Sequence, residues 1–236
     1  MTGRDFEKIN HLYEAAVRKV DASAKGQTKR AYGGMVRQAK GHVTERIAKE
    51  LVAAAWRNCG GQACRLDFPS GRIRIPMDPS YLKRPQVSSL VKREIASSAD
   101  DTYTYEFRPD VQVVIDSKLV MVIECKAYAE NAMLKRVLVD FQLLLKCHPN
   151  IKCVLFQLES QLGGDYGATR SPGRLGSPST HVLLSHFNVN LTFLTLLKGE
   201  RKVDRPIHKP DFFKPLEPQR VRGAVLALEE LLRSRV

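Results

Sequence analysis

The stretch RPDVQVVIDSKLVMVIECK, residues 108–126, decides the fold of this chain. Two apolar runs, 111–115 and 119–123, are rich in β-branched residues, which favour strands. Between them lies Asp116-Ser117-Lys118, a sequence typical of a turn. The stretch therefore predicts a β-hairpin with charged residues at both of its open ends.

The register of this hairpin decides which charged side chains meet. A three-residue turn pairs Ile115 with Leu119 and sets Asp110 opposite Glu124, whereas a two-residue turn leaves these two on a diagonal, still within reach. Cβ atoms of directly opposed residues lie roughly 5 Å apart. Because side chains alternate along a strand, Glu124 and Lys126 share one face. The hairpin therefore gathers two carboxylates and a lysine.

The second strand is apolar on both faces, which is typical of a central strand covered on both sides. Charges at the end of such a strand are costly unless they are paired or bound to a metal, and two adjacent carboxylates repel each other unless a cation joins them. Mg²⁺ prefers oxygen ligands, so Asp110, Glu124 and the backbone carbonyl of Cys125 are its expected ligands, with Mn²⁺ as a substitute. The alternative is a simple ion pair between Glu124 and Lys126, with Asp110 capping a turn.

Pro109-Asp110, then thirteen residues, then Glu124-Cys125-Lys126 resembles the motif of the PD-(D/E)XK nuclease superfamily. That superfamily includes most type II restriction endonucleases, Holliday-junction resolvases and several repair nucleases. The resemblance implies an α/β fold, a restriction-endonuclease-like core in which a central mixed β-sheet is flanked by helices. It also implies hydrolysis of DNA with Mg²⁺ held by Asp110 and Glu124 and with Lys126 as the catalytic lysine.

Members of this superfamily usually carry a further acidic residue on a helix that precedes the sheet. Apolar residues recur at helical spacing over residues 30–56, which predicts such a helix. Glu45 follows Gly41 in the Gly-x-x-x-Glu pattern frequent in that helix and shares a face with small residues, whereas Glu50 lies nearer the main apolar stripe. Glu45 is therefore preferred as the additional catalytic acid, with Glu50 as the alternative.

The rest of the chain predicts one nuclease domain over residues 1–236. A helix over 132–146 precedes a strand over 152–158, and such a crossover makes the flanking strands parallel. A further strand is expected over 190–197 and a last helix over 218–235. The expected parts are N-terminal helices in 1–60, a catalytic core in 103–160, a DNA-contacting loop in 161–180 and the C-terminal helix in 217–236.

The net charge of +13, from 38 basic and 25 acidic residues, indicates a polyanionic partner. A pure binding module gains nothing from clustered acids facing phosphates, so the carboxylate pair favours an enzyme. Arginine can pair with guanine in two hydrogen bonds, and basic residues lie in the loop and in a proline-rich stretch over 67–85. The expected DNA contacts are Lys83, Arg84, Arg170 and Arg174.

The five cysteines lack Cys-x-x-Cys spacing and indicate reduced thiols, since their spacing fits no familiar zinc module. No run approaches the ~18 apolar residues of a membrane span, and no signal-peptide segment begins the sequence. We therefore expect a cytoplasmic protein that does not contact membranes.

Together these patterns predict a Mg²⁺-dependent, sequence-specific endonuclease of double-stranded DNA in the type II restriction class. A palindromic target favours a homodimer in which each copy cuts one strand, and a companion DNA methyltransferase is the expected partner in the same system. The alternatives are a structure-selective or repair nuclease, such as a resolvase, and a catalytically inactive nucleic-acid-binding protein.

Overall fold

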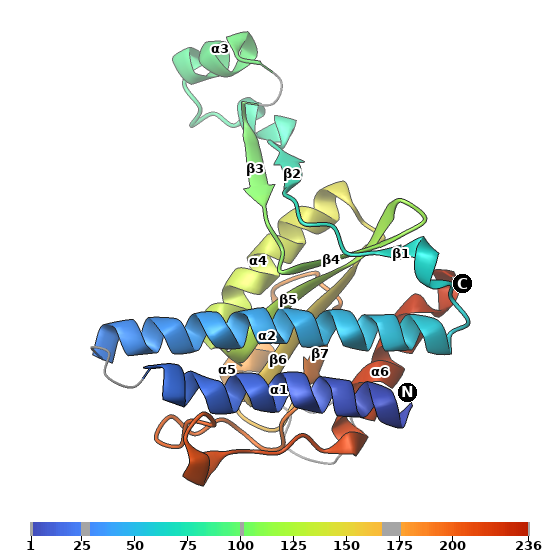
Figure 1. The fold of residues 1–236 in the computed structure, drawn as a ribbon. Coiled ribbons are helices and arrows are strands. Elements are labelled where there is room, and N and C mark those ends of the chain that lie inside the picture. Colours follow the sequence, from blue (N-terminus) through green and yellow to red (C-terminus); the bar gives the residue numbers. More distant parts are fainter. Residues whose placement is uncertain (1, 25–28, 100–101, 167–175, 236) are drawn as a thin grey trace.

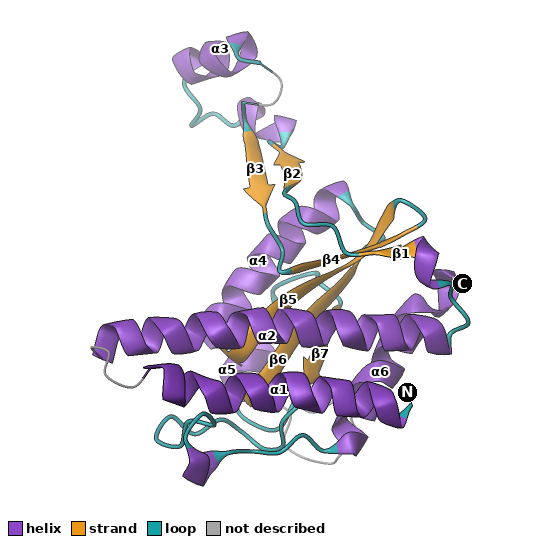
Figure 2. Ribbon diagram, viewed as in Figure 1, coloured by secondary structure: helices purple, strands orange, loops and turns teal. Residues whose placement is uncertain are grey.

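The structure, a computed structural model, describes residues 2–24, 29–99, 102–166 and 176–235, without the side chains of residue 16 and residues 18–40. A five-stranded mixed sheet forms its centre (Figures 1 and 2). Its strands are β1 (Leu66–Asp67), β4 (Val111–Ile115), β5 (Lys118–Glu130), β6 (Lys152–Gln161) and β7 (Leu191–Thr195), in the spatial order β1-β4-β5-β6-β7. β4 is antiparallel to both of its neighbours, whereas β5, β6 and β7 are parallel.

Helices cover both faces of this sheet, which confirms the predicted α/β fold class. The helices α1 (Gly3–Ala24), α2 (Lys29–Asn58) and α6 (Pro218–Leu232) lie on one face, and α4 (Asn131–Cys147) and α5 (Pro178–Ser185) lie on the other. The helix α4 is the predicted crossover between the parallel strands β5 and β6. Within the described residues, no helix has the length and apolar character needed to cross a membrane.

The helix α2 is buried on two sides because it lies between α1 and the sheet (Figure 1). Ile47, Leu51, Val52 and Ala55 are fully buried, although they project in different directions around the helix. Burying each large aliphatic side chain contributes about 1.5–3 kcal/mol. This double burial holds α2 in one position across the sheet. It thereby also fixes where the polar side chains at the exposed edge of the helix lie.

The hairpin of β4 and β5 has a two-residue turn, the shorter of the two turns that the sequence allowed. Ile115 pairs with Lys118, and Asp116 and Ser117 adopt positive φ angles of 50° and 63°. Two consecutive residues with positive φ form the turn whose twist matches that of the paired strands. Asp116 is held there by Arg65, whose Nη2 lies 2.6 Å from Asp116 Oδ2.

A β-bulge restores the register that the shorter turn alters. Val114 pairs with Leu119 but Val113 pairs with Met121, so Val120 is the extra residue on β5. Beyond the bulge Val111 pairs with Ile123, and the next position along each strand sets Asp110 opposite Glu124, as predicted.

Residues 73–99 and 102–107 form an arm that projects from the sheet (Figure 1). In it β2 (Ile73–Pro76) pairs with the antiparallel strand β3 (Thr104–Phe107), and between them lie the 3-10 turn η2 (Pro79–Lys83) and the helix α3 (Ser89–Ser97). From the sequence alone, part of this region is recognisable only as a proline-rich stretch. The two-stranded sheet could not be predicted because each of its strands has only four residues and because Pro76 ends β2.

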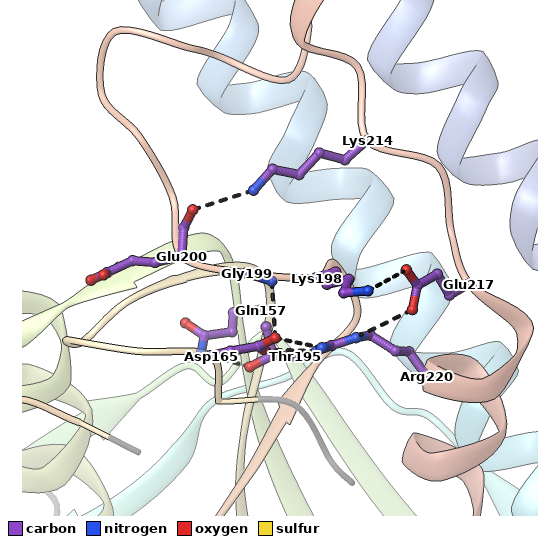
Figure 3. A network of polar contacts seen from close by, with 9 residues as sticks. All are labelled: Gln157, Asp165, Thr195, Lys198, Gly199, Glu200, Lys214, Glu217 and Arg220. Carbon is purple, nitrogen blue, oxygen red and sulfur yellow. Dashed lines mark hydrogen bonds and ion pairs between the residues drawn. The ribbon is translucent and has the colours of Figure 1, made fainter. Parts of the chain in front are cut away.

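A network of charged residues fixes the start of α6 to the segment after β6 (Figure 3). Arg220 donates to both carboxylate oxygens of Asp165, at 2.8 and 2.5 Å, and its Nε lies 3.8 Å from Glu217 Oε2. The Gly199 amide donates to Asp165 at 3.0 Å, and Lys198 pairs with Glu217 at 3.8 Å. Asp165 therefore joins three segments that are far apart in the sequence.

Candidate active site

The structure brings together the three residues that the hairpin motif predicted. Lys126 Nζ lies 2.7 Å from Glu124 Oε2 and 3.1 Å from Asp110 Oδ2. Asp110 follows the buried Pro109 at the start of β4, and its Oδ2 also accepts a hydrogen bond of 2.6 Å from the Cys125 backbone amide. The two carboxylates therefore share one cation at the point where β4 begins and β5 continues.

Burial controls the protonation of Glu124. Only 8% of the residue is exposed, and this burial raises the pKa of its carboxyl to about 7. The Lys126 ammonium opposes the shift, and the Asp110 carboxylate adds to it. A carboxyl with this pKa changes its charge near neutral pH, so a cation that binds there competes with a proton.

The two carboxylates keep Lys126 charged. Burial alone lowers its pKa, but Glu124 and Asp110 outweigh burial and raise the pKa of the ammonium to about 12. A lysine in this state donates hydrogen bonds and cannot accept a proton from water at neutral pH. A lysine beside a metal-bound water could orient that water or deprotonate it, and this arrangement favours orientation and charge stabilisation.

The two candidate helix acids lie in different surroundings. Glu45 is half-buried, and burial followed by repulsion from Asp110 raises the pKa of its carboxyl, while Lys126 acts in the opposite direction. Glu50 instead forms an ion pair with Lys8 of α1, with Glu50 Oε1 2.8 Å from Lys8 Nζ. The structure therefore places Glu45 beside the motif and turns Glu50 toward α1.

Two charged residues at the site were not found by sequence analysis. Arg136 and Asp140 of α4 line a cavity of about 110 Å³ together with Glu124 and Lys126. They are four residues apart and so lie on one face of the helix. The feature that could have indicated them is the short connection from β5 to α4. It places the first turns of α4 over the strand that carries Glu124 and Lys126.

The donor set fits a Mg²⁺ ion. The Lys126 ammonium, bound to one oxygen of each carboxylate, occupies the position of a shared cation. Among the described residues, neither Asp110 Oδ1 nor Glu124 Oε1 accepts a hydrogen bond, and no three His, Cys, Asp or Glu side chains cluster as a ready metal site. Mg²⁺ commonly takes only one or two carboxylates from a protein and completes its shell with water and substrate oxygens.

The remaining predicted residues lie at different places. The Cys125 thiol points into the core, and burial raises its pKa well above the ordinary value, so only the backbone of Cys125 faces the site. Lys83 and Arg84 are exposed on the arm, away from the carboxylates. Arg170 and Arg174 lie outside the described residues.

Comparison with known proteins gives the family of the chain. No family model matches it. It is 45% identical over 237 residues to the type II restriction enzyme DdeI of Desulfomicrobium norvegicum, covering 98% of this chain and 97% of that protein. The chain therefore belongs to the type II restriction enzymes, and it is a site-specific deoxyribonuclease.

A solved structure gives a second, more distant likeness. A chain of the native BbvCI A2B2 tetramer, determined at low resolution, aligns over 99% of this chain and 92% of its own length. The alignment has a TM-score of 0.40 and 10% sequence identity.

Proposed function

We propose that this restriction enzyme hydrolyses both strands of DNA in a Mg²⁺-dependent reaction at Asp110, Glu124 and Lys126, and that it is a member of the PD-(D/E)XK superfamily. One observation carries this proposal. The Lys126 ammonium joins the Glu124 carboxylate of β5 to the carboxylate of Asp110, which directly precedes β4, at distances of 2.7 and 3.1 Å, at the point where the fully buried part of β5 gives way to charged residues.

Asp110, Glu124 and the Cys125 carbonyl would hold the Mg²⁺ ion, which when bound polarises the scissile phosphate and activates a water. Loss of a proton from Glu124 prepares the site for this cation, since its pKa of about 7 leaves it partly protonated at neutral pH. Glu45 adds negative charge to the same site from α2.

The charged Lys126 would donate a hydrogen bond to the attacking water or to a phosphate oxygen and offset the negative charge that grows in the transition state. Arg136 adds a second cation on the opposite wall of the cavity. Among the described residues it forms no ion pair, so its guanidinium is free to bind a phosphate oxygen with two parallel hydrogen bonds.

We infer that the enzyme acts as a homodimer and that a companion DNA methyltransferase protects the same target. Two copies related by a two-fold axis match the symmetry of a palindromic site. A dimer of the 26.6 kDa chain should elute at twice that mass and convert supercoiled plasmid to linear DNA without accumulating nicked circles.

Incubation of the purified protein with a plasmid, with Mg²⁺ or with EDTA, tests the central proposal. Discrete fragments are expected only with Mg²⁺. The variants Asp110→Ala and Lys126→Ala should cut at least about 100-fold more slowly. The matched controls Asp116→Ala and Lys118→Ala, on the same hairpin, should stay within about twofold of wild type. Fragments in EDTA, or normal cutting by Asp110→Ala, would contradict the proposal.

A further inference from the structure

The arm, residues 73–99 and 102–107, carries positive charge at its far end. Its outer part contains Lys83, Arg84, Lys92 and Arg93, hereafter the tip cations, and no acidic residue occurs between Asp78 and Glu94. Three of the tip cations are exposed and Lys92 is half-buried. Within the described residues none of them forms an ion pair, and Arg84 stacks over Tyr81 at 5.6 Å.

The base of the arm is fixed to the helix that lines the active site. The Tyr105 hydroxyl donates to Asp140 Oδ1 at 2.8 Å, and Asp140 lines the same cavity as Glu124. Phe107 is buried and meets Phe141 edge to face, with ring centroids 6.3 Å apart. Further out, a cavity of about 700 Å³ separates the arm from the end of α4. The arm is thus held at its base, and an ion pair of 3.6 Å between Asp78 and Lys146 joins it to the end of α4 beside this cavity (Figure 1).

The chain runs from the arm directly into the catalytic motif. Phe107 ends β3, and Asp110 follows three residues later. The tip cations lie on the segment between β2 and β3, farther along the arm than Thr104, where β3 begins.

We propose that the arm grips the DNA duplex on which the active site acts, with the tip cations bound to backbone phosphates on one side of the cleaved bond. The β2–β3 ribbon and α3 are elements of the size that the major groove admits. This inference rests on the proposed cleavage site at Asp110, Glu124 and Lys126. Duplex DNA is favoured over a second copy of the chain because two such tips would repel each other, although Leu90 and Val91 are exposed beside them.

A charge-matched pair of variants tests the arm. The tip variant carries Lys83→Gln, Arg84→Gln, Lys92→Gln and Arg93→Gln. The control variant carries Arg4→Gln, Lys118→Gln, Arg222→Gln and Arg233→Gln, which remove four exposed cations outside the arm and the site. Affinity for a short mixed-sequence duplex is measured in EDTA from about 50 to about 200 mM NaCl, where the slope of log K against log salt falls by about 0.9 for each phosphate that the protein no longer neutralises.

The tip variant should show a slope reduced by about 3.6 relative to the control variant, with a raised KM and a kcat at saturating DNA within about twofold of wild type. The single variant Arg93→Gln, which removes one exposed charge, should lower the slope by about 0.9 and serves if the quadruple variant does not fold. Equal slopes for tip and control variants would overturn the proposal, as would a tip variant that loses only self-association. The salt dependence of binding is measured without Mg²⁺ and does not depend on cleavage. It therefore tests the arm even if the proposed cleavage mechanism fails.

Discussion

Glu124 is the residue at which burial and charge act most strongly against each other. Burial favours its neutral form, while the ammonium of Lys126, 2.7 Å away, favours the carboxylate. The outcome is a pKa of about 7, above the ordinary value of 4.5. The folded protein therefore holds a proton between these two pH values that the unfolded chain releases.

This difference predicts how stability depends on pH. The stabilisation by protonated Glu124 is complete below pH 4.5 and is lost as the pH rises through about 7. In EDTA, the free energy of unfolding of wild type should fall by about 2–3 kcal/mol over that range relative to Glu124→Gln, which cannot titrate. Urea unfolding at several pH values measures this. Glu94→Gln, a substitution on the exposed arm, should show the same change of unfolding free energy with pH as wild type. If Glu124→Gln also showed the wild-type change, the raised pKa would not belong to Glu124.

Arg136 gives a second prediction at this scale, because its neighbour Lys135 is a matched control. Both are exposed cations on α4, but only Arg136 lines the cavity with Glu124 and Lys126. Arg136→Gln should reduce kcat about 100-fold with little change in KM, since the guanidinium acts on charge that develops in the transition state. Lys135→Gln should cut like wild type. Equal rates for the two variants would remove Arg136 from the site.

At the scale of elements, the bulge in β5 corrects the register of the catalytic hairpin. A three-residue turn sets Asp110 opposite Glu124 in the sequence-based register, and the structure has the same pairing although its turn has two residues. The pairing is the same because a two-residue turn plus one bulged residue adds the same length as a three-residue turn. The bulge at Val120 has no signature in a run of apolar residues. The two strands of the hairpin could thus be predicted from the sequence. The position of the bulged residue could not.

This arrangement predicts opposite effects of two single-residue deletions. Deleting Val120 removes the bulge but leaves Val113 opposite Met121, so Asp110 stays opposite Glu124. That variant should lose about 2 kcal/mol of stability, from a buried valine, and still cut DNA at the same site. Deleting Val113 moves Asp110 by one position and turns its side chain to the other face, which should abolish cleavage. Plasmid cleavage and urea unfolding distinguish the two, and inactivity of a folded Val120 deletion would refute the register argument.

The packing of the elements explains why the sequence did not separate Glu45 from Glu50 as the catalytic acid of the helix, and why it did not predict the strands of the arm. Glu45 and Glu50 could not be separated by periodicity because α2 is buried against both α1 and the sheet, which leaves no single apolar stripe. The strands of the arm pair across about thirty residues, as Ile73 pairs with Phe107, so no local turn announces them. Both features depend on tertiary contacts rather than on local pattern.

At the scale of the whole molecule, Asp165 joins the segment after β6, the segment after β7 and α6 (Figure 3). Arg220, which supplies two of its hydrogen bonds, has a side chain only 10% exposed. Arg220→Ala should lower the free energy of unfolding by about 2–3 kcal/mol, because it leaves Asp165 without its main partner. Lys198→Ala removes a neighbouring ion pair whose side chains are 72% and 42% exposed and should cost at most about 0.5 kcal/mol. Thermal unfolding of the two variants compares them, and similar losses would contradict this difference.

The two ends of the arm meet at one place on the sheet. The Gln112 side chain donates to the Gly71 carbonyl at 2.9 Å where the chain leaves β1, and Asp110, two residues before Gln112, is where the chain comes back. A segment whose ends are neighbours can be lengthened, shortened or exchanged without displacing the strands on either side. Replacing the arm as a unit with that of a relative should therefore change how the enzyme holds the duplex while Asp110, Glu124 and Lys126 keep their places.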